Sequence, residues 1–227
     1  MKIAVIGAGK MSTLLGAYWA RGHHRIIVGS RDLTRARDVA GRIGQGACWG
    51  NYGEAIAAAD VVLLALTPDV VEFVARDHAA ALAGKIVVDC NTRHYPGGQK
   101  AYPVPSAPSL AERIATAAPE ARVVKAFASI GTDTLEYVLQ RNSTVVDGRR
   151  TSVFYCASDV EAGRCVRGLI DELHLDAVDC GDLGQAYYLE TLGALTMWLA
   201  DNRFGPRFTI DFSRSREREA SPLDRFM

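Results

Sequence analysis

The amino-acid sequence predicts an α/β fold with a doubly wound parallel sheet, a small C-terminal α/β extension and a long C-terminal helix. Two observations lead to this prediction. Short β-branched segments alternate with longer segments of helical periodicity, and several of the short segments are apolar throughout. Strands that helices cover on both faces are apolar in this way. The alternation implies right-handed crossovers between parallel strands of one sheet.

The first part of the chain contains five predicted strands and the helices that connect them. The strands are 2–6, 25–29, 60–66, 85–90 and 122–127. The connecting helices are 11–21, 33–44, 69–83 and 109–117. Residues 51–53 (Asn-Tyr-Gly) and 147–148 (Asp-Gly) are predicted to form turns, because both are typical turn sequences.

A second strand–helix–strand set follows, with segments 152–158, 159–174 and 176–181. After it comes a long apolar helix over about 184–201. This helix has more apolar surface than one exposed stripe requires, so we expect it to be buried within the monomer or shared with a second subunit. An edge strand is predicted at 207–212.

Composition and charge argue against several classes of protein. The formal net charge is zero, which gives no general attraction to nucleic acid or to an anionic membrane. No apolar run reaches the length of a membrane span, and Met1-Lys2 leads directly into a strand-like run without a signal-peptide layout. The five cysteines are widely spaced without a C-x-x-C pair, so we expect reduced, inert thiols. No spacing suggests a metal site, and we expect a cytoplasmic protein without nucleic-acid or membrane partners.

A glycine-rich segment follows the first strand and opens the first helix. Its residues are Gly7, Ala8, Gly9, Lys10, Met11 and Ser12. Gly7 permits a tight turn, and Gly9 lets the backbone approach a pyrophosphate that rests on the helix N-terminus. Ser12 stands where a third glycine is usual, and a small side chain suits the close packing of helix and strand there. Because a second strand follows at the right distance, we predict a Rossmann-type dinucleotide-binding unit.

The end of the second strand indicates which dinucleotide binds. Many NAD-binding units place an acid here to accept hydrogen bonds from the ribose 2′-OH. This chain instead has Ser30, which can donate to a 2′-phosphate, and Arg31, which can pair with that phosphate and lie against the adenine. Arg35, one helical turn further, could close on the same phosphate. Asp32 could be a displaced ribose acid, but we interpret it as the N-cap of the next helix and therefore expect NADP(H).

Six segments carry a family resemblance that extends to about residue 200: MKIAVIGAGKM…IIVGSRD, VVDCNT, ARVVKAF, FYCASDVEAGR, DAVDCG and AYYLETLGALTMWLA. Together they resemble the coenzyme F420-dependent NADP oxidoreductases. The resemblance implies a Rossmann domain, a C-terminal part that helps two subunits pair, and hydride transfer between NADP(H) and an acceptor, with coenzyme F420 as co-substrate. It also implies that Leu66, Thr67 and Pro68 pass beside the ribose and nicotinamide, and that Asn91 lies where the fifth strand meets the nicotinamide.

These observations divide the chain into three parts. Residues 1–130 are the predicted NADP-binding Rossmann domain, and residues 131–212 are a small C-terminal α/β part that we expect to form the contact of a homodimer. Residues 213–227 are a charged tail that we expect to be mobile and solvated, because its charges alternate in sign.

The segment 91–110 leaves the carboxyl end of a central strand, where open α/β sheets bind their ligands. It contains four prolines and two glycines and shows no periodicity, so we expect a lid or a substrate wall. If the acceptor needs a proton donor, His94 is the best candidate by type and location, with Tyr95, Tyr102 and Ser129 behind it. The alternative for His94 is an ordinary exposed loop histidine.

The sequence gives weaker indications for three other titratable residues. Lys125 interrupts the apolar strand 122–127, so it could touch the substrate, or it could be a structural lysine that extends its amine to solvent. His23 and His24 precede the second strand and are predicted to face solvent.

Three functions are compatible with these residues. The first is an NADPH-dependent reductase of a deazaflavin, as the resemblance implies. The second is a reductase of a small carbonyl, imine or activated alkene, which is favoured because Ala128-Ser129 stands where the family has Asn-Thr. The third is a non-catalytic NADPH-sensing module. A tricyclic deazaflavin needs a broad slot beside the nicotinamide, a small acceptor needs a narrower open cleft, and a sensor would have an occluded one.

Overall fold

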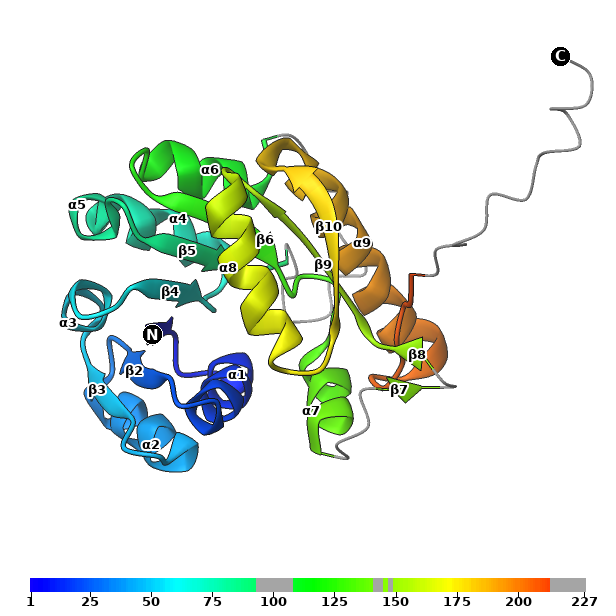
Figure 1. The fold of residues 1–227 in the computed structure, drawn as a ribbon, viewed down its shortest axis with the longest axis horizontal. Helices are drawn as coiled ribbons and strands as arrows, with labels where there is room; N and C mark the ends of the chain where they lie inside the picture. Colours follow the sequence, from blue (N-terminus) through cyan, green and yellow to red (C-terminus); the bar gives the residue numbers. More distant parts are fainter. Residues whose placement is uncertain (93–107, 141–144, 147–148, 213–227) are drawn as a thin grey trace, which may run out of the picture.

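The computed structural model describes residues 1–92, 108–140, 145–146 and 149–212. Its central feature is one eight-stranded sheet with helices on both faces (Figure 1). The strands, in their order across the sheet, are β10 (Asp176–Asp182), β9 (Ser152–Ala157), β6 (Arg122–Ala126), β5 (Ile86–Asp89), β4 (Val61–Leu64), β1 (Lys2–Ile6), β2 (Arg25–Gly29) and β3 (Cys48–Gly50). A separate antiparallel pair consists of β7 (Val145–Val146) and β8 (Arg149–Arg150).

The sheet is parallel except at one junction. Strands β3, β2, β1, β4, β5 and β6 pair in parallel, as do β9 and β10. Strand β9 runs antiparallel to β6, with Lys125 opposite Cys156. The carboxyl ends of β9 and β10 therefore lie at the opposite edge of the sheet from those of β1 to β6. The predicted fold class is confirmed, and the C-terminal strands extend the same sheet.

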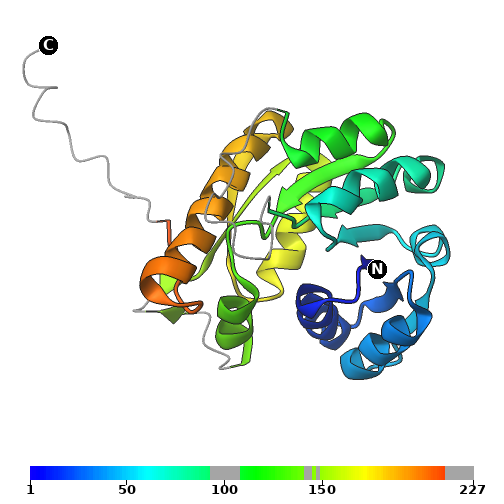
Figure 2. The same ribbon diagram turned by 180° about the vertical axis from the view of Figure 1, so that it is seen from behind.

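Successive side chains along each strand point to opposite faces of the sheet and so belong to two separate cores. Ile3 and Val5 of β1 belong to one core cluster, whereas Ala4 and Ile6 belong to the other. The first core is covered by α1 (Lys10–Arg21), α2 (Leu33–Ile43), α7 (Thr132–Gln140) and α8 (Val160–Asp171). The second core is covered by α3 (Tyr52–Ala57), α4 (Pro68–Asp77), α5 (Ala79–Leu82), α6 (Leu110–Ala117) and α9 (Ala186–Leu199), as Figure 2 shows from behind. Strands buried on both faces in this way must be apolar along their whole length.

The long C-terminal helix is buried on one side only. It begins with a 3₁₀ turn, η1 (Leu183–Gln185), continues as α9 and ends in a π-helical segment, η2 (Ala200–Phe204). Its inward face includes Leu189, Glu190 and Gly193. Its outward face exposes Tyr188 and Leu195, at 65% and 50% of their surface.

Two predicted turns have different outcomes. The predicted turn at 51–53 is wrong, because Asn51 is the N-cap of α3: its side chain accepts from Glu54 N–H at 2.9 Å, and the Glu54 carboxylate accepts from Asn51 N–H at 2.9 Å. This reciprocal pair is a capping box, which starts a helix. The predicted turn at 147–148 and the tail at 213–227 lie outside the described residues.

Two other predicted elements are also corrected. The predicted helix 69–83 is two helices, α4 and α5, which meet at His78. The predicted strand 207–212 does not form. Side chains from distant parts of the sequence bind its backbone instead of a neighbouring strand: Thr134 Oγ1 donates to Phe208 O at 3.1 Å, and Ser152 Oγ accepts from Phe212 N–H at 3.0 Å. Helix α7 and strand β3 were not predicted. Among the described residues, no helix is long and apolar enough to cross a membrane.

Candidate active site

The carboxyl ends of β1, β2 and β4 surround a cavity of 360 Å³. Most of the predicted cofactor-binding residues line it. The lining consists of Gly7, Ala8, Gly9, Ser30, Arg31, Asp32, Arg35, Tyr52, Ala65, Leu66, Thr67 and Val70. The cavity therefore brings together the glycine loop, the end of the second strand and the segment after β4, which are far apart in the sequence.

The glycine loop has the backbone geometry that a phosphate site requires. Gly7 has a φ of +115°, and a Cβ atom on it would lie 2.2 Å from Ala65 O, so no other residue fits there without a shift. A Cβ on Gly9 would meet nothing within 4 Å, which leaves open space where a ligand can approach the backbone. Gly9 is the N-cap of α1, and no side chain caps this helix. Its first N–H groups can therefore bind an anion.

The three residues after Gly9 do not line this cavity. Lys10 forms ion pairs with Asp133 and, at 2.8 Å, with Glu136, both on α7. These hydrogen bonds raise the pKa of Lys10 above its usual value. Lys10 also lines an adjoining cavity of 510 Å³ that shares Ala8, Gly9 and Arg35 with the first one.

Met11 and Ser12 lie on the core side of α1. Met11 packs against the core cluster that α1 covers. Ser12 is fully buried, as expected for a small residue between helix and strand, and its Oγ has no hydrogen-bond partner among the described residues.

At the end of β2, two arginine side chains line the cavity. Arg31 and Arg35 are exposed and line the cavity, and within the described residues neither forms an ion pair. Ser30 is buried, and its Oγ accepts from Asp32 N–H at 3.2 Å, so its hydroxyl hydrogen can be donated to a ligand. Asp32 is the N-cap of α2, and its side chain accepts from Arg35 N–H at 3.1 Å. The N-cap interpretation of Asp32 is confirmed.

Asn91 lies beside the cavity and holds the chain that lines it. Its side chain is buried, accepts from Leu66 N–H at 3.0 Å and donates to Leu64 O at 3.0 Å. Pro68 occupies the first turn of α4, after Thr67 as N-cap. Asn91 thus ties the end of β5 to the end of β4 and to Leu66. Its side chain holds the segment that lines the cavity.

Lys125 is fully buried, so the interpretation that it extends its amine to solvent is wrong. Its Nζ donates to Asp89 Oδ2 at 2.7 Å and to Asn91 O at 2.6 Å, and it lies 3.0 Å from Glu190 Oε1. Burial by itself lowers the pKa of Lys125, but the two carboxylates outweigh burial and raise it. The side chain therefore stays charged within a network that the sequence analysis did not predict.

The segment after β6 turns sharply against α9. Phe127 is buried and has a φ of +63°, a left-handed conformation that is strained for a residue with a bulky side chain. Ser129, two residues on, is 8% exposed. A Cβ on Gly193 of α9 would lie 2.5 Å from Ala128 O and 2.3 Å from Thr92 Cγ2, so the helix contacts this turn directly. The structure places Ser129 in this region, and His94, Tyr95 and Tyr102 lie outside the described residues.

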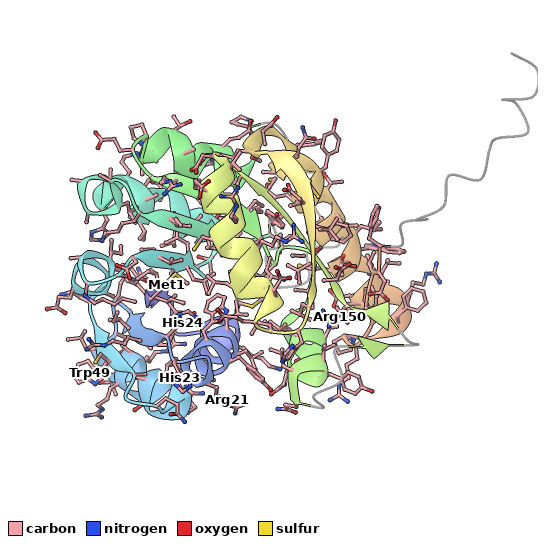
Figure 3. All side chains as sticks on the ribbon, in the orientation of Figure 1. Met1, Arg21, His23, His24, Trp49 and Arg150 are labelled. Atoms are coloured by element: carbon pink, nitrogen blue, oxygen red, sulfur yellow. The ribbon has the colours of Figure 1, made fainter. Side chains whose placement is uncertain are left out.

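The histidines before β2 are remote from the cavity. His23 and His24 lie beside Met1 at the amino ends of β1 and β2, the opposite edge of the sheet (Figure 3). His23 is exposed as predicted. The prediction is wrong for His24, whose side chain is only 9% exposed because it bonds Glu172 Oε2 at 2.8 Å.

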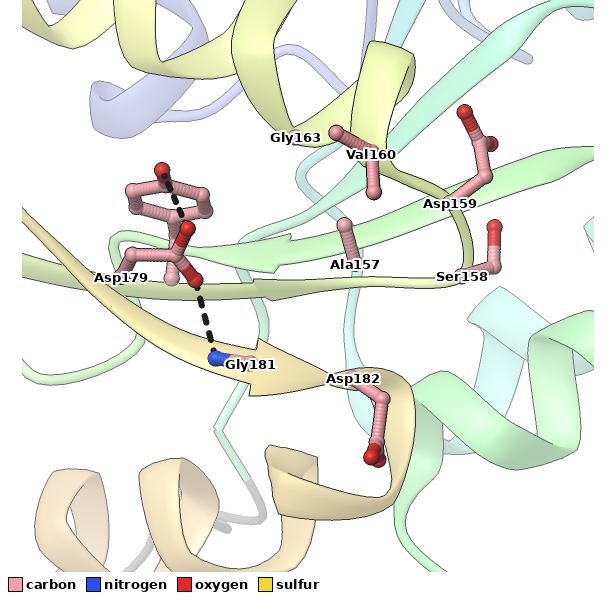
Figure 4. Close-up of a pocket in the computed structure, with 9 residues that line it drawn as sticks. Ala157, Ser158, Asp159, Val160, Gly163, Asp179, Gly181 and Asp182 are labelled. Carbon is pink, nitrogen blue, oxygen red and sulfur yellow. Dashed lines mark hydrogen bonds between the residues drawn. The ribbon is translucent and has the colours of Figure 1, made fainter.

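A cavity of 310 Å³ lies at that opposite edge, between β9, β10 and the start of α8 (Figure 4). Its carboxylates are already engaged within the chain. Asp179 accepts from Tyr155 OH at 3.1 Å and from Gly181 N–H at 2.9 Å, and Asp182 accepts from Gly184 N–H at 2.9 Å. In the described part of the chain, no group of three or more His, Cys, Asp or Glu residues could hold a metal ion. We assign no ligand to this cavity.

The five cysteines are free. Burial raises the pKa of Cys90 and of Cys156 to about 12. A thiol with such a pKa is hardly ionised at neutral pH and is a poor nucleophile. These two thiols are inert, as the sequence predicts.

The fold, the absence of a side-chain cap on α1 among the described residues and the cationic end of β2 are the features of a Rossmann-type dinucleotide-binding domain. Residues 2–93 match the family described as NADP oxidoreductase, coenzyme F420-dependent. The predicted resemblance is confirmed over this nucleotide-binding part of the chain. No curated protein matches the sequence.

Solved structures share the fold at low sequence identity. A candidate F420-dependent NADP reductase from Arthrobacter sp. FB24 superposes with a TM-score of 0.82 at 24% identity, covering 94% of this chain and 100% of that one. An imine reductase from Streptomyces aurantiacus superposes with a TM-score of 0.60 at 20% identity, covering 88% of this chain and 63% of that one. A reductive aminase from Aspergillus terreus, in complex with NADPH and ethyl-5-oxohexanoate, gives 0.59 at 22% identity, covering 86% and 60%. The chain spans about two thirds or less of the last two proteins.

Proposed function

We propose that the protein binds NADP(H) in the 360 Å³ cavity and transfers a hydride between it and an acceptor beside the nicotinamide. The observation that carries this proposal is a pair of guanidinium groups, Arg31 and Arg35, that form no ion pair within the described part of the chain and lie beside the Ser30 hydroxyl. A 2′-phosphate would bind all three through charge-assisted hydrogen bonds. The pyrophosphate would rest on the N-terminus of α1, against Gly7 and Gly9.

The order of the strands indicates how the cofactor would lie across the carboxyl edge of the sheet. The phosphate loop follows β1, and the 2′-phosphate site lies at the end of the neighbouring β2. A dinucleotide crosses the carboxyl edge of such a sheet, so the nicotinamide would lie on the other side of β1, at the ends of β4 and β5. Leu66, Thr67 and Asn91 are the residues at that position.

For the acceptor, we propose deazaflavin coenzyme F420 first, because residues 2–93 match the F420-dependent family. Hydride transfer to a deazaflavin needs little acid–base help, since holding two rings face to face supplies most of the acceleration. The chain's own contribution would be to orient the rings and exclude water from between them.

The second candidate acceptor is a small carbonyl, imine or activated alkene. The turn after β6 supports it, because Gly193 of α9 lies against Ala128 and this close approach would narrow the region where the acceptor binds. Such an acceptor gains negative charge or a basic nitrogen and needs a proton donor. We propose Ser129 and His94 for that role, Ser129 because it is buried at this turn. A non-catalytic NADPH sensor is the third possibility, and it predicts binding without turnover.

The experiment that tests the function is single-turnover oxidation of bound NADPH, followed by absorbance at saturating acceptor. Oxidised F420 and a panel of ketones, imines and activated alkenes are the acceptors. We expect oxidation with F420. Oxidation by small acceptors alone would establish the second candidate, and tight NADPH binding without oxidation by any acceptor would contradict an enzymatic function.

We further propose that the protein is a homodimer in the cytoplasm. The outward face of α9 supports the dimer, since it exposes Tyr188, Leu195 and Trp198 on one long helix. Large exposed apolar groups in one patch are typical of protein–protein contacts. The free cysteines are consistent with a reducing compartment.

A further inference from the structure

A buried charged cluster connects β5, β6 and α9 to the nucleotide cavity. We call its four residues, Asp89, Asn91, Lys125 and Glu190, the Lys125 network. Asp89, Lys125 and Glu190 are fully buried, and Asn91 is 6% exposed. Asp89 and Lys125 are direct partners in the parallel pairing of β5 and β6, so their side chains leave the sheet side by side.

Lys125 is held from three directions. Its Nζ donates to Asp89 Oδ2 at 2.7 Å and to Asn91 O at 2.6 Å, and it lies 3.0 Å from Glu190 Oε1. These three acceptors match the three hydrogens of an ammonium group. A buried ion pair gives little net stability, because the cost of removing its charges from water offsets most of their attraction. Stability alone therefore does not explain why this sheet contains it.

Glu190 anchors the far side of the network. Its Oε1 accepts from Leu110 N–H at 2.7 Å and from Ala111 N–H at 3.3 Å, at the start of α6. The positive end of that helix stabilises the carboxylate. The position of Lys125 is thus fixed by two strands and two helices together.

The near side of the network leads to the cavity. Asp89 Oδ1 accepts from the main-chain N–H of Asn91 at 3.0 Å and from its Nδ2 at 2.7 Å. Asn91 Oδ1 in turn accepts from Leu66 N–H at 3.0 Å, and Leu66 lines the cavity. An unbroken chain of hydrogen bonds therefore runs from Lys125 through Asp89 and Asn91 to the segment at the end of β4.

We propose that Lys125 is a positioning residue that fixes Asn91, and through it Leu66, against the nicotinamide half of NADP(H). This inference rests on the proposed function, which puts the nicotinamide at the ends of β4 and β5. Lys125 is too deeply buried to serve as a group that binds the cofactor itself. The adenosine half would lie beyond β1, at Ser30 and Arg31, where no residue of the Lys125 network reaches.

Two variants perturb the network in different ways. Lys125→Met alone would remove the ammonium group that both carboxylates, Asp89 and Glu190, contact, so we combine it with Glu190→Gln; the pair of changes removes one charge of each sign. Asp89→Asn keeps the lysine and Glu190 but replaces the carboxylate that holds Asn91. If the double variant does not fold, Asp89→Asn carries the test alone.

Lys85→Met is the matched control. Lys85 precedes β5 at the opposite edge of the sheet, and its Nζ donates to Ala59 O at 2.5 Å. The substitution removes a lysine that bonds the main chain just before β4. This lysine lies outside the Lys125 network and does not line the cavity. Thermal unfolding of all variants reports the structural cost separately from ligand binding.

The measurement is the dissociation constant for NADPH and for 2′,5′-ADP, which keeps the 2′-phosphate but lacks the nicotinamide, together with the fluorescence of bound NADPH. We expect the two network variants to weaken NADPH about tenfold and to shift its fluorescence, with 2′,5′-ADP bound as in the wild type. Lys85→Met should change neither ligand. Equal weakening of both ligands, or unchanged NADPH binding, would overturn the positioning role. Wild-type protein that binds neither ligand would instead contradict the proposed function.

Discussion

The Asp32 carboxylate accepts a hydrogen bond from the backbone N–H of Arg35 at 3.1 Å, which caps α2 at the point where the chain leaves the nucleotide cavity. This hydrogen bond distinguishes two roles for Asp32, a helix cap and a ligand of the cofactor's ribose. As a cap it fixes the first turn of α2, and with it the guanidinium of Arg35. As a ribose ligand it would favour NAD and oppose a 2′-phosphate.

The cap predicts how Asp32 variants behave. Asp32→Ala should lower the free energy of unfolding by about 1 kcal/mol, whereas Asp32→Ser, which keeps a capping oxygen, should restore most of it. Asp32→Ser should not weaken NADPH, because it removes a negative charge near the 2′-phosphate site. Chemical denaturation and NADPH titration check both statements. Weaker NADPH binding by Asp32→Ser would show that the carboxylate contacts the cofactor.

A second prediction concerns the contact between α9 and the turn after β6. Gly193→Ala should destabilise the protein by about 1–3 kcal/mol, because its methyl group has no room beside Ala128 O and Thr92. The control is Gly168→Ala on α8, where a Cβ meets nothing within 4 Å. That change should stabilise the protein by about 0.5–1 kcal/mol. Urea unfolding measures both, and equal effects would mean that α9 does not pack as described.

The sequence predicts most of the sheet, because strands covered on both faces must be apolar along their length. It also predicts the cavity, because the glycine loop and the end of β2 are local patterns. The start of α3 was missed, since a helix of only six residues shows little periodicity. The Asn51–Glu54 spacing of a capping box was the available signal. The strand predicted at 207–212 does not form, because Thr134 and Ser152 bind its backbone. Both residues are distant in the sequence, so a local pattern could not reveal these contacts.

The Lys125 network could not be predicted from local patterns. Asp89 and Lys125 each interrupt an apolar strand, and a buried charge generally requires a partner. That pairing becomes visible only when β5 and β6 are placed side by side in register. Glu190 comes from a helix that follows both strands in the chain, so only the tertiary fold brings it to the ammonium.

A third prediction is a pH dependence of stability at the Asp159–Arg122 ion pair. The Arg122 guanidinium beside Asp159 holds the pKa of that carboxyl below its usual value of 3.8. The pair therefore stabilises the protein above about pH 4, and this contribution is lost as pH falls through the lowered pKa. Both side chains are more than a third exposed, so the contribution should be less than about 1 kcal/mol.

Asp159→Asn tests that dependence, because Asn can still cap α8 as Asp159 does. The variant should be less stable than the wild type at neutral pH, and the difference should shrink as the pH falls below about 4. Denaturant unfolding at several pH values measures the difference. A difference that stays constant down to pH 2 would exclude the ion pair as its cause.

A fourth prediction concerns the oligomeric state. Sedimentation at micromolar concentration should show a dimer for the wild type, and Leu195→Glu should shift it towards monomer, because a charge would be buried in the contact. Phe73→Glu is the control, since Phe73 is a large exposed apolar residue on a different helix, α4. A monomeric wild type would contradict pairing through α9.

The central claim is that Arg31 selects NADP(H) over NAD(H), and the most direct test is titration with NADPH and NADH of the wild type, Arg31→Ala and Arg37→Ala. Arg37 is an exposed arginine on α2 that does not line either cavity beside the glycine loop. We predict that the wild type prefers NADPH and that Arg31→Ala weakens NADPH about tenfold or more, since one charge-assisted bond contributes about 1.5–3 kcal/mol. NADH should lose much less affinity, because it shares only the adenine contact with Arg31. Arg37→Ala should bind both as the wild type does. Equal wild-type affinity for the two cofactors, or a loss of NADH binding equal to that of NADPH in Arg31→Ala, would contradict this account.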